Sequence, residues 1–313
     1  MTVSFYRAFR IMKTVAPATV FFSNKQKGNN VMETAASLIR RSLILFFALV
    51  AWAGGSLSGE PYISSGNMEI ARTLEFNYDD GVSFCQGLAT DGKIFYGIGC
   101  VKFLNYNAIT KIDIQSGEII ERHEMCLPKE LMNKGYSHLG DGCLYEGRLY
   151  IALEDFGFRH PGVIVYDPDT LEAVDFHMLP DEGRGNGRIP WCVVKDDVLY
   201  YSQSNDVDEI RMLNLRDYSY IGALKTDTTL FKVQGGEIYD GTLYMVTNSG
   251  SRNKTMFAVN LQTGHTEPVF VRCTGKLDAE GEGIAICPLE DGSLFHIIDV
   301  GYKVRITSYR PAE

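Results

Sequence analysis

The chain of 313 residues is 45% hydrophobic and 22% charged, the composition of a folded globular protein rather than of a disordered or fibrous one. Its formal net charge of −9 disfavours binding to phosphate backbones, and no basic patch interleaved with aromatic residues offsets this charge. We therefore expect no nucleic-acid partner, whereas a cation or a cationic ligand is compatible with the charge.

The first 53 residues differ from the rest of the chain. Residues 1–31 contain no acid, and Arg40 and Arg41 precede the apolar run SLILFFALVAWA. About ten apolar residues are too few to span a bilayer, which needs about 20, and basic residues before a short apolar run are typical of a secretory signal peptide. The sequence predicts an exported protein, periplasmic or extracellular, with residues 1–53 as a signal peptide or an uncleaved anchor.

Met32 is the better predicted start, because translation from Met1 makes the basic region unusually long. Residues 54–65 are predicted to form a linker, and contact with a membrane is expected only through the N-terminal segment if it stays uncleaved. None of the seven cysteines forms a Cys-x-x-Cys pair, so a zinc ribbon is not indicated. Cys143, Cys192 and Cys287 are expected as buried thiols in strands, and disulfide pairing is left open.

A turn recurs along the chain at intervals of about 50 residues, which is the sequence signature of a β-propeller. It appears in TDGKIFY, YEGRLYI, KDDVLYY, YDGTLYM and EDGSLFH, with Gly or Asp at position 92, 147, 197, 241 or 292. Asp-Gly between two apolar runs predicts a hairpin, because glycine tolerates the positive φ of such turns. Each repeat has room for four antiparallel strands.

The last repeat is one strand short, because only VRITSYR follows its first hairpin. The alternating segment 69–77, EIARTLEFN, lies before the first repeat and has no hairpin partner. Used as the last strand of the fifth sheet, it would close the ring and leave no open edge. We predict an all-β, five-bladed β-propeller over residues 66–311, expected as a monomer, with six blades as the alternative.

Four of the five repeats place an amide or carboxylate where the innermost strand of each blade should begin, six positions before the turn, or at the equivalent place before the longer turn CPLEDG of the fifth repeat. This strand lines the central channel, and β propensity alone would favour Val or Ile there. The five positions hold Gln86, Asp141, Trp191, Gln234 beside Gly235, and Glu282. The alternative is that these side chains only satisfy backbone groups and water in the channel.

Further candidates flank these positions. His138 lies shortly before Asp141 and could join it, and Glu280 lies shortly before Glu282. Arg188, in the loop DEGRGNGR, could bind an anionic group. Oxygen ligands at Asp141 and Glu282 would suit a hard cation such as Ca²⁺. Trp191 would offer a stacking wall to a ligand.

The segment FCQGLATDGKIFYGIG resembles the first blade of glutamine cyclotransferases of the plant and bacterial type, which are five-bladed propellers. Phe84, Gln86, Gly87 and Leu88 match the family's Phe-Thr-Gln-Gly-Leu opening, with Cys85 in place of Thr. The resemblance implies that this opening faces an active site. The family's Glu-Gly motif in the next blade is replaced by SHLGDG, so His138 or Asp141 would have to substitute for its acid. The motifs HLGD, VQGG and EGEGI resemble a broader group of exported bacterial propellers of unassigned function.

Three functions are compatible with this pattern. The first is binding of a small polar molecule or peptide at the channel mouth, with cyclotransferase-type chemistry: Phe84, Gln86, Trp191 and Gln234 position the substrate, and Glu282, Asp141 or His138 carries protons. The second is a calcium-dependent lactonase- or esterase-like hydrolase with Asp141 and Glu282 as metal ligands. The third is a non-enzymatic scaffold for a protein partner.

Overall fold

A computed structural model describes residues 68–249, 253–273 and 279–312 of the chain. The predicted signal peptide or anchor, with the start at Met32, and the linker 54–65 lie outside the described residues. In the part that is described, no helix is long and apolar enough to cross a membrane.

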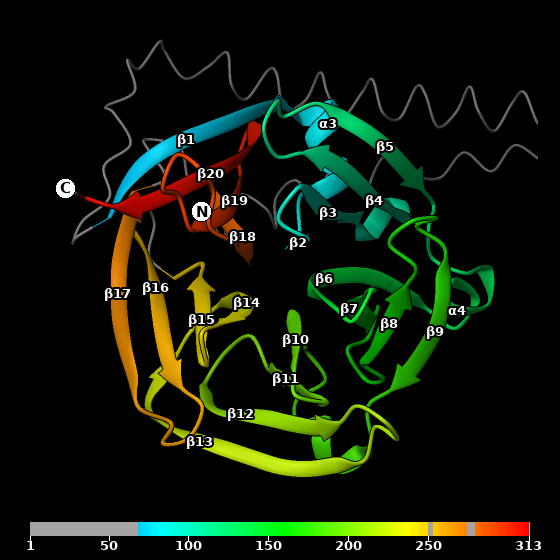
Figure 1. The fold of residues 1–313 in the computed structure, drawn as a ribbon. Helices are drawn as coiled ribbons and strands as arrows, with labels where there is room; N and C mark the ends of the chain where they lie inside the picture. Colours follow the sequence, from blue (N-terminus) through cyan, green and yellow to red (C-terminus); the bar gives the residue numbers. More distant parts are fainter. Residues whose placement is uncertain (1–67, 250–252, 274–278, 313) are drawn as a thin grey trace, which may run out of the picture. The chain divides into compact units, whose positions relative to one another are not determined.

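The described strands form five antiparallel sheets of four strands each, arranged as blades around a common centre (Figure 1). In each blade the strands follow one another from the centre outward. The first two blades contain β2 (Gly87–Thr90), β3 (Ile94–Val101), β4 (Tyr106–Asp113) and β5 (Ile119–Glu124), then β6 (Tyr136–Tyr145), β7 (Arg148–Asp155), β8 (Gly162–Tyr166) and β9 (Ala173–Met178).

The other three blades repeat this order. They contain β10 (Trp191–Lys195), β11 (Val198–Ser202), β12 (Val207–Asn214) and β13 (Tyr220–Leu230); β14 (Val233–Tyr239), β15 (Thr242–Thr247), β16 (Asn253–Asn260) and β17 (Thr266–Cys273); and β18 (Glu280–Ile286), β19 (Phe295–Val300), β20 (Lys303–Pro311) and β1 (Met68–Asn77). Short helical turns lie between strands: α3 (Tyr78–Gly81), η1 (Val82–Phe84), η2 (Lys102–Leu104), α4 (Lys129–Asn133) and η3 (Asp181–Gly183).

Strand β1 closes the ring as the outermost strand of the fifth blade (Figure 1). It pairs with β20 from Met68 opposite Pro311 to Asn77 opposite Lys303. Glu75 forms ion pairs with Lys303 and Arg305, the latter at 2.9 Å. The prediction of five blades closed by residues 69–77 is confirmed, because this strand supplies the fourth member of the fifth sheet.

The recurring turns have the geometry that the sequence predicts. Gly92 has a φ of +87°, and Oδ1 of Asp91 accepts hydrogen bonds from the backbone N–H groups of Lys93 and Ile94 at 2.8 and 2.7 Å. Asp197 occupies the equivalent place in the third blade with a φ of +59°, which aspartate tolerates better than most residues. Local turn chemistry therefore defines the hairpins.

Apolar side chains fill the space between adjacent blades. Leu88, Phe95 and Ile298, for example, are fully buried in the cluster that joins the first and fifth blades. The cysteines whose side chains are described, at positions 85, 100, 126, 143, 192 and 287, are free and buried. The expectation of buried thiols at Cys143, Cys192 and Cys287 is thus confirmed.

Candidate functional site at the mouth of the ring

The innermost strands β2, β6, β10, β14 and β18 contact one another in cyclic order around the centre. Because each pairs antiparallel with the next strand, the start of each inner strand lies beside the end of that strand. His138 faces Glu154, Trp191 faces Ser202 and Glu280 faces Val300. We call this end of the ring, where the inner strands begin, the mouth.

Three inner strands have register shifts at the polar positions singled out by the sequence. The shifts lie between Leu139 and Gly142, between Val233 and Gly235, and between Gly281 and Ile284. They contain Asp141, Gln234 and Glu282. A β-bulge redirects a side chain and interrupts pairing, and bulges are frequent next to active sites.

Asp141 is fully buried and connects all five blades. Its carboxyl oxygens accept hydrogen bonds from the backbone N–H groups of Leu88 at 2.8 Å and of Gly236 and Ile284 at 3.2 Å. Its own N–H donates to the carbonyl of Pro190 at 2.7 Å, immediately before β10. Burial raises the pKa of Asp141 to about 8, although the backbone donors favour the charged form.

Glycines allow the inner strands to converge on Asp141. A Cβ on Gly283 would lie 2.5 Å from Cα of Gly87 and 2.6 Å from Oδ1 of Asp141. A Cβ on Gly235 would lie 2.6 Å from the other carboxyl oxygen. The glycines of QGLA, VQGG and EGEGI are therefore required by close approach of backbones at the centre.

Glu282 is a buried acid at the mouth, with 4% of its surface exposed. Its Oε2 accepts a hydrogen bond from Nε2 of Gln234 at 2.9 Å, and Oε1 of Gln234 accepts one from the hydroxyl of Ser204 at 3.3 Å. Burial raises the pKa of Glu282 well above its usual value, and the charge of exposed Glu280 raises it further. A carboxyl group whose pKa is raised in this way is suited to proton transfer, because its protonated form persists to higher pH.

Gln86 lies at the same mouth but is not bonded to Glu282. It is half-buried, and its Nε2 donates to the carbonyl of Cys85 at 3.0 Å. The charge of Glu282 contributes to the raised pKa of the buried Cys85 thiol, after burial itself, so the two groups are near each other. Phe84, by contrast, is fully buried and packs edge-on against Phe76; it supports the turn rather than facing a ligand in this structure.

Trp191 is fully buried rather than exposed at the mouth. Its Nε1 donates to the hydroxyl of Ser202 at 3.0 Å, and a Cβ on Gly236 would lie 2.6 Å from its Cε3 atom. The indole therefore fills the space between the third and fourth blades. In this structure it offers no stacking surface to a ligand.

His138 faces a buried acid that sequence reasoning missed. Its Nδ1 lies 3.1 Å from Oε2 of Glu154, and Oε1 of Glu154 accepts the backbone N–H of Ile189 at 2.7 Å. Glu154 is fully buried, whereas His138 is partly exposed. The acids Glu154 and Asp155, directly after the apolar residues YIAL, were the available signal. His138 therefore lies beside Glu154, and it takes no part in the hydrogen bonds of Asp141.

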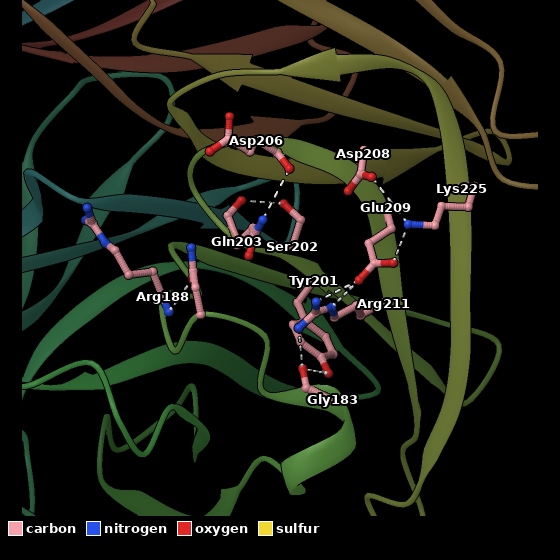
Figure 2. Close-up of polar contacts among 11 residues, drawn as sticks. Gly183, Arg188, Tyr201, Ser202, Gln203, Asp206, Asp208, Glu209, Arg211 and Lys225 are labelled. Carbon is pink, nitrogen blue, oxygen red and sulfur yellow. Dashed lines mark hydrogen bonds and ion pairs between the residues drawn. The ribbon is translucent and has the colours of Figure 1, made fainter.

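Arg188 lies on the loop before β10, and its guanidinium carbon is 4.7 Å from the centroid of the Phe158 ring. Figure 2 shows it apart from the polar network of the third blade, in which Arg211 and Lys225 are tied to Glu209. No group of three or more His, Cys, Asp or Glu side chains among the described residues could hold a metal ion. Calcium at Asp141 and Glu282 stays a prediction.

Comparison with known proteins supports the fold. No family model matches the chain, and no curated protein sequence matches it either. The solved structure of glutaminyl cyclase from Myxococcus xanthus is similar with a TM-score of 0.54 and 13% identity, over 81% of this chain and 100% of that one. A luciferin-regenerating enzyme is similar with a TM-score of 0.49 and 10% identity, over 77% of this chain and 96% of that one.

These observations define the class of protein. The chain is a five-bladed β-propeller whose mouth carries a buried, hydrogen-bonded acid, and its fold resembles that of a glutaminyl cyclase. At this identity the likeness extends to the fold, and the chemistry must be argued from the mouth itself.

Proposed function

We propose that the protein binds a small polar molecule or peptide at the mouth and cyclises an N-terminal glutamine, as a glutaminyl cyclase does. The observation that carries this proposal is the 2.9 Å hydrogen bond between Gln234 and the buried Glu282. The fold likeness to a glutaminyl cyclase and the Gln86 segment point the same way.

The reaction needs one proton to move between two nitrogens. The substrate's α-amine attacks the carbon of its own side-chain amide, a new C–N bond closes the ring, and the amide C–N bond breaks to release ammonia. The amine gives up a proton and the departing nitrogen takes one. A neutral carboxyl group can do both, by donating its own proton to the leaving nitrogen and accepting the proton of the amine.

Glu282 has the surroundings for this role. Gln234 fixes one of its oxygens, and Glu280 is exposed beside it and can exchange protons with water. The amide nitrogen of Gln86 donates a hydrogen bond to the carbonyl of Cys85. The amide oxygen, Oε1, has no hydrogen-bond partner among the described residues. That oxygen would accept a hydrogen bond from the substrate.

The experiment is release of ammonia from a peptide with an N-terminal glutamine, measured for the wild type, Glu282→Gln and Glu237→Gln. Glu237 is the matched control because it is another acid of an inner strand whose pKa burial raises, to about 8. We expect Glu282→Gln to lose at least a hundredfold in rate, since general acid–base groups typically contribute about 10²–10⁴-fold. Folded wild-type protein that releases no ammonia from any such peptide would overturn the proposal.

The metal-dependent alternative has its own test. Three backbone N–H groups point at the carboxyl oxygens of Asp141, where a cation would meet the positive ends of their dipoles. A calcium site there would require a higher melting temperature in millimolar calcium and loss of that increase in Asp141→Asn. The same measurement without any calcium effect would remove Asp141 as a ligand.

A further inference from the structure

A second group of side chains at the mouth brings two cations onto one aromatic ring. Nζ of Lys102 lies 3.6 Å from the centroid of the Phe158 ring, and the guanidinium carbon of Arg188 lies 4.7 Å from the same centroid. Lys102 begins the helical turn after β3, Phe158 follows β7, and Arg188 precedes β10. Three blades therefore contribute to one cationic cluster, which we call the Phe158 cluster: Lys102, Phe158 and Arg188.

The loop that carries Phe158 is held in place by buried polar contacts. Asp155 is 7% exposed, and its carboxylate accepts the backbone N–H groups of Gly157 at 3.0 Å and of Arg159 and His160 at 2.7 Å. Phe158 itself has a φ of +55°, which bulky residues rarely adopt. Unusual backbone conformations of this kind cluster at binding and catalytic sites.

The loop of Arg188 packs directly against this loop. Gly187 has a φ of +84°, and a Cβ there would lie 1.6 Å from the carbonyl oxygen of Phe158. Only glycine permits this approach, which places the next residue, Arg188, over the ring. The cluster is therefore set by the packing of two backbones rather than by two long side chains that happen to meet.

Neither cation forms an ion pair with a carboxylate of the described residues. Among the described residues, no acidic oxygen lies within ion-pair distance of Lys102 or Arg188, and the buried Nε of Arg188 has no hydrogen-bond partner. Arg211 and Lys225 of the third blade show the contrast, because both are ion-paired with Glu209 (Figure 2). Two like charges held on one ring without a directly paired carboxylate are an arrangement that an anion would stabilise.

The surroundings select the kind of anion. Burial lowers the pKa of Lys102 and the charge of Arg188 lowers it further, whereas the nearby charges of Glu154 and Asp155 raise it. Those two acids lie close to the cluster, so a dianion such as a phosphate would meet stronger repulsion than a carboxylate. Phe156, 68% exposed, lies with its ring centroid 5.0 Å from Nζ of Lys102 and offers apolar contact next to the charges.

We propose that the Phe158 cluster is a subsite for a carboxylate that is attached to an apolar group. It would hold the acidic part of a ligand whose other end lies elsewhere at the mouth. The inference concerns binding, so it stands whether or not the proposed cyclisation occurs. A peptide with a free C-terminal carboxylate beside an apolar side chain has this chemistry.

The test is calorimetric titration with N-acetyl-phenylalanine and with its uncharged amide. We expect saturable binding of the carboxylate, at least tenfold weaker binding of the amide, and weakening by added salt because the contact is ionic. Lys102→Gln and Arg188→Gln should each weaken binding several-fold. Lys93→Gln is the control, since it removes an exposed charge from the turn at the opposite end of the inner strand.

Unchanged thermal unfolding of the variants would establish that they are folded. Equal affinity for the carboxylate and the amide, or wild-type affinity in both cluster variants, would overturn the proposal. So would an equal loss in Lys93→Gln, because the effect would then be one of net charge. Inorganic phosphate that binds more tightly than the carboxylate would contradict the choice of a monoanion.

Discussion

Asp141 accepts the backbone N–H of Leu88 at 2.8 Å although the two residues are 53 positions apart in the chain. The same carboxyl group accepts hydrogen bonds from the backbone N–H groups of Gly236 and Ile284. One side chain of the second blade therefore bonds to the inner strands of the first, fourth and fifth blades. Asp141 therefore satisfies buried backbone donors of three other blades, which would otherwise be costly to leave unpaired.

Asp141→Ala should destabilise the fold strongly. It leaves three buried donors without acceptors, each of which costs about 1–3 kcal/mol, and we expect a loss of about 3 kcal/mol or more in the free energy of unfolding. Urea denaturation measures this loss. Asp79→Ala, at an exposed acid of α3, is the control and should stay within about 0.5 kcal/mol of the wild type. A loss in Asp141→Ala as small as in the control would contradict the assigned role.

The glycines around Asp141 lead to a second prediction. A Cβ on Gly283 would meet backbone and carboxyl atoms at 2.5 and 2.6 Å, and these atoms belong to strands that cannot move apart. We expect Gly283→Ala to cost about 3 kcal/mol of stability, as overpacking of a core does. Gly301→Ala serves as control, because its Cβ would lie 3.6 Å from the nearest atom, an ordinary contact. The two variants should differ clearly in urea midpoint.

The sequence revealed those parts of the fold that depend on local chemistry. The turns at Gly92 and Asp197 were visible because their residues tolerate positive φ, and segment 69–77 could be assigned because an unpaired strand needs a partner. Burial at the mouth could not be read in the same way. Trp191 was expected to face a ligand, but Gly236 of the next blade leaves space for its ring, and only the structure shows that contact.

The candidate site was predicted in part for the same reason. Gln234 and Glu282 were recognised as polar residues at the start of strands, but their hydrogen bond depends on two bulges in adjacent blades. The recurring inner-strand positions do not point to Glu154 or Lys102. Glu154 lies in β7, the second strand of its blade, and Lys102 follows β3, the second strand of the first blade. Most of the site is formed by contacts between residues of different blades, and a single sequence does not show which residues of different blades touch.

Stability should fall as the pH rises from about 6.5 to 8. Burial raises the pKa of Asp141 and of Glu237 to about 8, whereas unfolded carboxyl groups titrate near 4, so the folded state binds the extra protons in this window. His296, whose pKa burial lowers to about 4, opposes this trend only below about 6.5. Each raised group contributes up to about 1.4 kcal/mol per pH unit.

Urea denaturation at several pH values checks this dependence. Glu237→Gln removes one of the titrating groups and should flatten the decline, while the sign stays the same because Asp141 and Glu282 remain. Stability that rises with pH in this window, or a slope that Glu237→Gln leaves unchanged, would show that these acids are already ionised in the folded protein.

Removal of β1 should open the ring. A chain that begins at Tyr78 leaves β20 with an unpaired edge and leaves Arg305 and Arg310 without their acidic partners Glu75 and Glu69. We expect this chain to melt at a lower temperature and to aggregate through the exposed edge. Addition of a peptide of residues 68–77 should restore part of the melting temperature, and a peptide with Glu75→Lys should restore less. Equal melting of the shortened and full chains would contradict closure by β1.

The pH profile of the proposed reaction provides the last prediction, because it separates Glu282 from the substrate. The rate should rise with pH as the substrate's α-amine, with a pKa near 7.7–8.0, loses its proton, and should fall with pH as Glu282, whose pKa burial raises, loses its own. The charge of Glu280 contributes to the raised pKa of Glu282, after burial itself. Glu280→Gln removes that charge, so the falling limb of kcat/KM should move to lower pH while the rising limb stays in place. Glu237→Gln should move neither limb, since Glu237 does not contact the mouth acid. A falling limb that stays fixed in Glu280→Gln would mean that another group carries the proton, with His138 beside Glu154 the next candidate at the mouth.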